Sequence, residues 1–150
     1  MRTALLVAGL VLVTGCGADE EPAQDDRIRA TLGGVELLLE VADDPDERAV
    51  GLMGRESVPP GTGMVFRYDE PVQTRFYMYD VPVPLRAVFV RAGRVVHSVL
   101  MPPCELDVPQ DCPTYGPDEP FDTVVETAPE TLPDVQPGDR LVLSPAGAAS

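Results

Sequence analysis

The sequence predicts an α+β domain that is mostly antiparallel β-sheet, partly curled toward a barrel, with one short helix near residues 45–53. Three observations predict this class. Short stretches that alternate apolar and polar residues recur along the chain, Gly- and Pro-containing turns separate them, and one segment carries the signals of a helix start. The chain has 150 residues, of which 44% are hydrophobic, and this is enough to fill a single core.

The expected strands follow one another along the chain. Residues 27–32 and 35–41 should form a hairpin, because Gly33 and Gly34 between them favour a tight turn. A turn at Pro137, Gly138 and Asp139 introduces the last strand. Beyond the hairpin, the expected strands cover residues 63–68, 74–79, 85–91, 94–101, 121–127 and 140–144.

One segment, residues 45–53, carries the signals of a helix. Asp43 or Asp44 can cap it, Pro45 suits the first turn, and two acidic residues follow near the positive end of the helix dipole. Gly54 is the expected stop. One face should be buried, and it consists of Ala49, Val50, Leu52 and Met53.

Residues 1–15 are predicted to be a lipoprotein signal peptide. Their apolar run, residues 4–14, would rise only about 16 Å as a helix, which is about half of a bilayer's hydrocarbon core. Residues 13–16 (VTGC) resemble a bacterial lipobox. We therefore expect Cys16 to be lipidated and to anchor the protein to the cell membrane, facing the extracytoplasmic side. An ordinary signal peptide with an incidental cysteine is the alternative.

The charge pattern divides the rest of the chain. Residues 16–26 are the predicted lipidated cysteine and an acidic tether, residues 27–145 the folded domain, and residues 146–150 a flexible tail.

The chain has 25 acidic residues against 11 basic ones, all of them arginine, for a net charge of −14. This balance excludes nucleic acid as a partner, because phosphate binding needs clustered cations.

The two remaining cysteines, Cys104 and Cys112, form an even pair in a compartment where disulfides persist. The prolines around them indicate a loop. We expect a structural disulfide, which should stabilise the fold by about 2.5 kcal/mol by closing a short loop. A metal site or a redox pair is the alternative, although the spacing is not Cys-x-x-Cys and no histidine lies nearby.

Several motifs together resemble the DUF192 domain family over about residues 37–143. They are GLMGR at 51–55, GMVF at 63–66, FYM at 76–78 and VPVPL at 81–85, followed by the cysteine pair, Tyr115 and the turn at 137–139. The resemblance implies a compact β-rich domain with one short helix, and no established reaction. The chain departs from the family at several positions: Tyr77 replaces a Trp, Tyr79 and Asp80 replace a Lys-Asn pair, and Arg86 replaces an Asp. The late strand also departs, because residues 126–129 (ETAP) stand where the family has Glu-Leu-x-Ala-Gly.

These departures and the arginine after the helix suggest a binding site. Aromatic rings with arginines and acids suit sugars or small anions, so we expect a shallow cleft for an envelope glycan or small ligand. The candidate ligand-binding residues are Arg55, Tyr77, Tyr79, Asp80 and Arg86. In the alternative, structural interpretation, Arg55 ties the helix end to a carboxylate such as Asp80 or Glu126.

We assign no catalytic residue. The one histidine, His97, precedes Ser98 on a predicted strand, and neighbouring strand residues point to opposite faces, so the two do not form a pair. A carboxylate-dependent hydrolase acting on an envelope polymer is the alternative function, because 25 acidic residues allow a facing pair. We expect no metal and no cofactor, since the methionines that could bind Cu(I) sit at positions typical of a core: Met53, Met64, Met78 and Met101.

Overall fold

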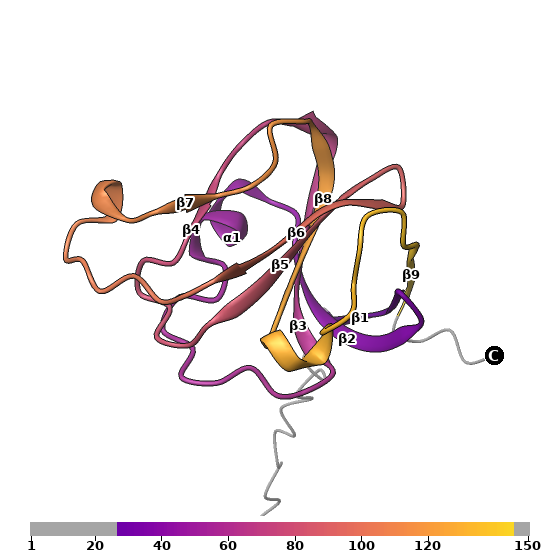
Figure 1. Ribbon diagram of the computed structural model, residues 1–150, viewed down its shortest axis with the longest axis horizontal. Helices are drawn as coiled ribbons and strands as arrows, with labels where there is room; N and C mark the ends of the chain where they lie inside the picture. Colours follow the sequence, from indigo (N-terminus) through magenta and orange to yellow (C-terminus); the bar gives the residue numbers. More distant parts are fainter. Residues whose placement is uncertain (1–26, 146–150) are drawn as a thin grey trace, which may run out of the picture.

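The computed structural model describes residues 27–145 (Figure 1). Its elements are β1 (Arg27–Leu32), β2 (Val35–Ala42), α1 (Pro45–Val50), β3 (Thr62–Val72), β4 (Phe76–Tyr77), β5 (Leu85–Arg91), β6 (Arg94–Met101), the 3-10 turn η1 (Pro109–Asp111), β7 (Thr114–Tyr115), β8 (Phe121–Thr127), the 3-10 turn η2 (Pro129–Thr131) and β9 (Leu141–Pro145). The predictions of the signal peptide, Cys16, the tether and the tail fall outside these residues.

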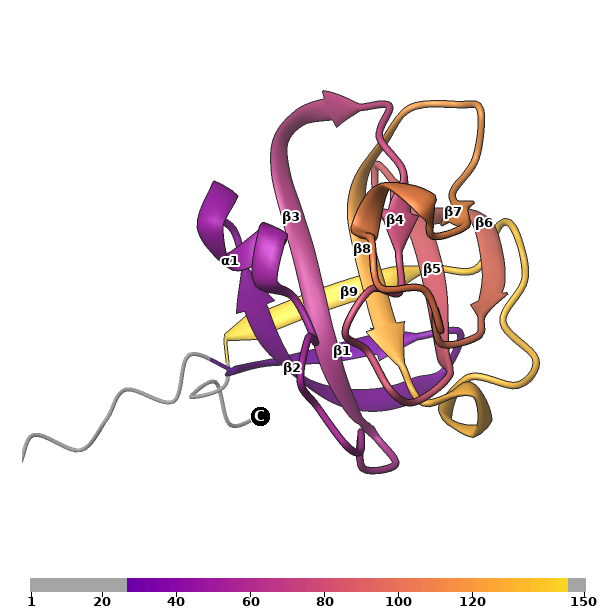
Figure 2. The ribbon, with the colours of Figure 1, turned by 90° about the vertical axis from the view of Figure 1, so that its left-hand side faces the viewer.

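The main sheet has seven strands in the order β6-β5-β8-β3-β2-β1-β9, and β4 pairs with β7 in a separate ribbon. All neighbours are antiparallel except β2 and β3, which run parallel. The sheet curls strongly, so that β1, β2 and β9 run across the direction of β3 and β8 (Figure 2). A backbone bridge between Arg94 and Arg140 brings the two edge strands together at one end. The predicted curl toward a barrel is therefore confirmed.

The fold is nearly all-β, which corrects the α+β prediction. Within residues 27–145 the α-helical content is the six residues of α1, and no helix there is long and apolar enough to cross a membrane. Asp44 caps α1, and its carboxylate accepts the backbone N–H of Glu47 at 2.8 Å. The helix ends before Gly51, not at Gly54, because Gly51 adopts a positive φ of 49° and leaves the helical path.

The early end of α1 changes which residues are buried. Val50 is 59% exposed and Ala49 is also exposed, so the predicted buried face is wrong at these positions. Leu52, which follows the helix end, is 4% exposed and joins the core. Burial in this region therefore comes from the chain beyond the helix and not from a helical stripe.

The strand predictions hold for most of the main sheet and fail in the segment that leads into the β4–β7 ribbon. β1, β5, β6 and β8 have the predicted bounds, whereas β3 extends to Val72 and the predicted strand at 74–79 shrinks to Phe76–Tyr77. The short β7 inside the Pro-rich segment was not expected. It forms because Tyr115 pairs with Phe76 across the ribbon, a contact that depends on tertiary structure.

Two apolar clusters occupy opposite faces of the sheet. One cluster takes residues from all seven strands, including Val65, Val88 and Val125, and fills the space that the curl encloses. The other cluster contains residues of β2, β3, β5, β6 and β8 that point to the opposite face, such as Phe66 and Phe89, and is covered by Leu52, Met78 and Val81. Where β3, β5 and β8 pair, they are buried on both faces, and consecutive residues there are apolar: 64–66, 87–90 and 124–125.

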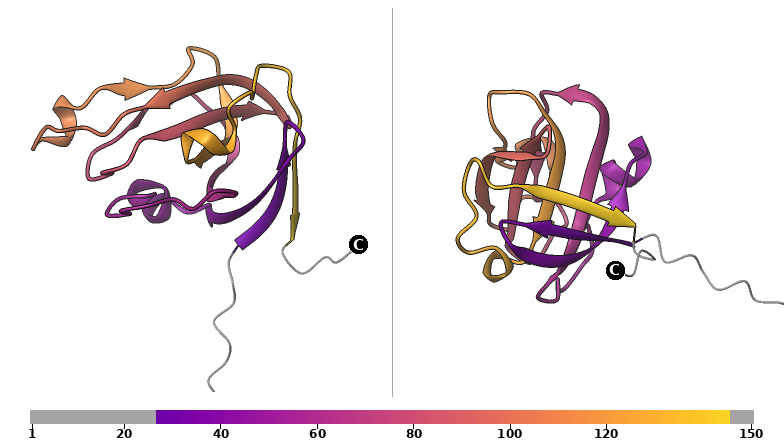
Figure 3. Two further views of the ribbon diagram at one scale, coloured as in Figure 1. Left: turned by 60° about the horizontal axis from the view of Figure 1, so that its bottom comes forward. Right: turned by 90° about the vertical axis from the view of Figure 1, so that its right-hand side faces the viewer.

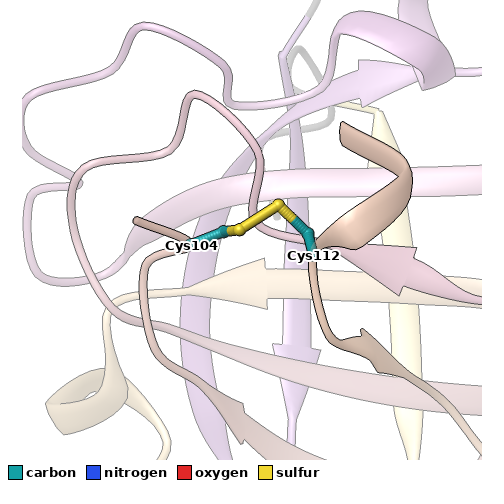
Figure 4. Close-up of a disulfide and its surroundings, with 2 residues drawn as sticks. All are labelled: Cys104 and Cys112. Carbon is teal, nitrogen blue, oxygen red and sulfur yellow. A yellow bond between two sulfur atoms is a disulfide. The ribbon is translucent and has the colours of Figure 1, made fainter. Parts of the chain in front are cut away.

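The predicted disulfide between Cys104 and Cys112 is present, with Cα atoms 5.8 Å apart (Figure 4). It joins the chain after β6 to the end of η1, directly before β7. The backbone N–H of Cys104 also donates to the carbonyl of Met78 at 3.3 Å. The bridge thus fastens the β4–β7 ribbon over the second cluster.

Breaking this bridge should destabilise the domain. We expect the Cys104→Ala/Cys112→Ala variant to lose about 2.5 kcal/mol of unfolding free energy, because its unfolded chain gains the entropy that the loop had lost. Urea denaturation of the variant and of wild type with and without reductant measures this loss. Reductant should lower the stability of wild type alone; equal sensitivity in both proteins would contradict a structural role for the bridge.

Candidate functional site

A pocket of about 220 Å³ lies between the end of α1 and the β4 segment. Residues 48–53 form one wall and residues 74–78 the other. The right-hand view of Figure 3 shows the helix that leads into the first wall beside β3. The floor comes from β3, β5 and β8. The β4 wall is held by β7 and by the disulfide. Both lie in the Pro-rich segment that the sequence analysis predicted to be a loop, so the pocket depends on that segment.

The lining is mainly aromatic and aliphatic. Four aromatic rings line the pocket, those of Phe66, Tyr68, Phe76 and Tyr77. Phe66 and Phe76 pack edge to face with their ring centroids 5.2 Å apart, and Phe76 packs in the same way on Phe89. Such packing fixes the orientation of the rings. The aliphatic part of the lining includes Leu52, Met53, Met78, Val81 and Leu85.

Glu126 on β8 lines this pocket and is only 5% exposed. Its neighbours across the strands are Met64 on β3 and Ala87 on β5, both in the cluster beneath the pocket. No hydrogen bond or ion pair reaches its carboxyl group from residues 27–145. Burial without a partner raises the pKa of Glu126 from 4.5 to about 8.

The close approach of β3 to β8 holds Glu126 in place. A Cβ atom on Gly63 would lie 2.0 Å from the backbone carbonyl oxygen of Glu126, so no other residue fits at position 63. The GMVF motif therefore begins with glycine for a packing reason. Its next residue, Met64, is the apolar neighbour of the buried carboxyl.

Two arginines line the pocket, and both are bound to backbone carbonyls. Arg48 donates to the carbonyls of Asp43 and Arg67, and its guanidinium lies 4.8 Å from the centroid of the Tyr68 ring. Arg75 donates to the carbonyl of Gly116 and lies 3.8 Å from a carboxylate oxygen of Asp118.

The pKa of the Tyr68 hydroxyl is raised, chiefly by burial. Arg48 opposes this shift, and the charge of Glu126 adds to it. Tyr68 therefore lies within electrostatic range of both Arg48 and Glu126.

The five predicted ligand-binding residues are not gathered in one place. Tyr77 lines the pocket and is 41% exposed. Arg55 instead binds Glu40 through two hydrogen bonds of 2.8 and 2.5 Å, and that hydrogen bonding raises its pKa. The partner is thus neither Asp80 nor Glu126. Both side chains are well exposed, so the pair contributes at most about 1 kcal/mol.

The other three candidates lie apart from the pocket lining. Asp80 is exposed in a turn with φ of 55°, and its backbone carbonyl accepts the N–H of Gly54. Tyr79 is half-buried beside it. Arg86 alternates with Leu85 along β5 and so points to the opposite face, where it donates to Ser98 Oγ at 3.2 Å. Its Nε is buried without an acceptor, and nothing in the structure explains this.

The described part of the chain contains no group of three His, Cys, Asp or Glu side chains that could hold a metal ion. His97 packs against Phe89, with ring centroids 5.9 Å apart, while Ser98 contacts Arg86 on the other face. The separation of His97 from Ser98 by strand alternation is therefore confirmed.

The fold and pocket define a small, nearly all-β domain with a ligand-sized cavity beside its one α-helix. The chain belongs to the DUF192 family, described as uncharacterized ACR, whose model matches residues 28–143. A proposed transcription regulator from Sinorhizobium meliloti has a similar structure, with a TM-score of 0.66, 28% identity and coverage of 78% of this chain and 92% of that one.

A protein of unknown function from Novosphingobium aromaticivorans is also similar, with a TM-score of 0.64 and 26% identity. The similarity covers 77% of this chain and 84% of that one. None of the curated proteins matches the chain significantly. Family membership thus fixes the fold and leaves the activity open.

Replacing Glu126 with glutamine should change how stability depends on pH. Between about pH 5 and pH 8 the folded protein keeps a proton on Glu126 that the unfolded chain releases, so the unfolding free energy of wild type falls as pH rises. Glu126→Gln removes this term. Its advantage over wild type should be small near pH 5 and on the order of 4 kcal/mol near pH 8.

Urea denaturation at several pH values measures this difference. Glu130→Gln is the matched control, because it removes an exposed carboxylate and should leave the pH profile unchanged. Parallel profiles for wild type and Glu126→Gln would show that Glu126 is ionised in the folded protein throughout.

Proposed function

We propose that the protein is a membrane-anchored, extracytoplasmic lipoprotein whose DUF192 domain binds a small ligand in the pocket between α1 and β4. One observation carries the binding proposal: a buried carboxyl that has no partner among residues 27–145 lines a pocket walled by four aromatic rings. A cavity of about 150 Å³ holds a benzene molecule. A pocket of about 220 Å³ therefore suits a single small molecule or one terminal unit of an envelope glycan.

The geometry favours binding over hydrolysis. A glycosidase needs two carboxyl groups that face each other across the bound bond, about 5 to 9.5 Å apart. Among the described residues that line the pocket, Glu126 is the one carboxylate, and the other charged groups are Arg48 and Arg75. We therefore prefer a binding or accessory module to the carboxylate-dependent hydrolase.

A role in transcription, suggested by the name of the Sinorhizobium meliloti protein, is not part of this proposal. With a net charge of −14 and no lysine, the chain lacks the cations that nucleic acid binding requires. The lipobox-like residues 13–16 support a location at the membrane, where the partner of the anchor is lipid.

The anchor proposal predicts that Cys16→Ser releases the protein from membranes. Without the thiol no acyl chain can be attached, and the folded domain has no other predicted means of anchoring. Fractionation of cells that express wild type and Cys16→Ser tests this, with Cys104→Ala/Cys112→Ala as a control that keeps Cys16. Equal amounts of Cys16→Ser and wild type in the membrane fraction would overturn the anchor proposal.

The binding proposal predicts that small neutral molecules enter the pocket. Titration with phenol and with N-acetylglucosamine, followed by amide NMR, should shift signals of residues 48–53 and 74–78 for at least one of them. Ala49→Trp should abolish the shifts, because Ala49 is an exposed residue of the lining that a large side chain would close. Val142→Trp, which changes an exposed residue on β9, should not. Shifts that are unaffected by Ala49→Trp would refute binding at this site, and the absence of shifts with both molecules would refute a site for small neutral molecules.

A further inference from the structure

The pocket has a property that restricts the charge of its ligand. The carboxyl of Glu126 is nine-tenths buried or more, lines an open cavity, and has no hydrogen-bond or ion-pair partner within residues 27–145. Buried carboxyl groups in proteins normally have such partners, because burying the ion alone is costly. A ligand group that enters the pocket can form the hydrogen bond or ion pair that the carboxyl of Glu126 lacks.

The rings around this carboxyl suit a positive charge. The faces of aromatic rings are negative and attract cations, and rings combined with a carboxylate form cages for organic ammonium groups. Arg48 already covers the ring of Tyr68. The rings of Phe66, Phe76 and Tyr77 also line the pocket. The surface of the whole chain, with a net charge of −14, attracts cations as well.

The arginines of the lining do not neutralise Glu126. Arg48 is held by two backbone carbonyls, and Arg75 by the carbonyl of Gly116 and by Asp118. Burial raises the pKa of Glu126, and no cation among the described residues offsets this effect. Within the part of the chain that the structure describes, the carboxyl of Glu126 therefore has no counter-charge.

We propose that the ligand of this pocket is a small organic cation with an apolar body, whose positive group pairs with the carboxylate of Glu126 while its body packs against the aromatic walls. This inference rests on the proposed function and specifies its ligand class. A primary amine, an amidine or a guanidine on a ring or a short chain has the required chemistry, and the volume limits the ligand to about ten non-hydrogen atoms.

Binding of such a cation is coupled to release of a proton. The protonated carboxyl gives its proton to solvent, and the resulting carboxylate pairs with the cation, so charge and atoms balance. The charged or titratable groups that line the pocket with Glu126 are Arg48 on α1, Tyr68 on β3, and Arg75 and Tyr77 on the β4 segment. From β5 come two apolar residues, Leu85 in the lining and Ala87 as the cross-strand neighbour of Glu126. Because the pKa of Glu126 is about 8, affinity should rise with pH and level off above that value.

Three probes of equal shape test the ligand class on the purified full-length protein. Benzamidine is a cation, benzamide is neutral and benzoate is an anion. Calorimetric titration near pH 8 should show benzamidine binding at least about tenfold more tightly than the other two. Its affinity should rise by up to about tenfold per pH unit between about pH 6 and pH 7.5, and titration in two buffers of different ionisation enthalpy should detect nearly one proton released near pH 7.

Variants provide a second, independent measurement. Glu126→Gln should weaken benzamidine binding at least about tenfold near pH 8 and make it independent of pH, whereas Glu130→Gln should bind as wild type does. The pH profile and the proton release need only the wild-type protein, so they decide the question even if Glu126→Gln folds poorly.

The outcomes separate this inference from the proposed function. If benzamide or benzoate binds as tightly as benzamidine, or if affinity falls as pH rises, the cation assignment is overturned and the pocket stands as a binding site. If none of the three binds at about 10 mM, the cation assignment is also overturned. The titration with phenol and N-acetylglucosamine then decides independently whether the pocket binds small neutral molecules.

Discussion

The contact of β3 with β8 at Gly63 is the constraint on which the rest of the structure depends. With a Cβ position only 2.0 Å from the carbonyl oxygen of Glu126, the two strands can pair in this register only because position 63 is glycine. This pairing places β8 between β3 and β5 and buries all three on both faces. It also fixes Glu126 between Met64 and Ala87, and so determines what lies beneath the pocket.

The sequence predicted those strands and turns whose formation depends on residues close together in the chain. The strands β1, β5, β6 and β8 have the predicted bounds and β2 runs one residue further than predicted, because alternation and turn residues act within a few residues of the chain. The helix was predicted three residues too long, since nothing local distinguishes Gly51 from Gly54 as a stop. β7 was missed because only its pairing with β4, fixed by the Cys104–Cys112 bridge, makes it a strand.

The candidate site was harder to predict than the fold. Of the five candidates, Tyr77 lines the pocket. The other four were grouped with it by residue type and not by face, and they lie outside the lining: Arg55, Tyr79, Asp80 and Arg86. Strand alternation alone separates Arg86 from Leu85, so this signal was available in the sequence. Glu126 gave a weaker signal, since it is an acid directly after two valines. Its burial could not be predicted, because the residues that bury it are cross-strand neighbours far away in the chain.

The pairing of β1 with β9 places the two ends of the described domain side by side, with Ile28 opposite Pro145. A polypeptide whose ends meet on one sheet edge can be cut and rejoined without disturbing its interior. A short linker across this edge, with new ends opened in the exposed loop between Glu56 and Pro60, would give a circular permutant with the same strand order. Because its two ends are adjacent, the domain could also be inserted into a loop of another protein, with both connections at one point on its surface.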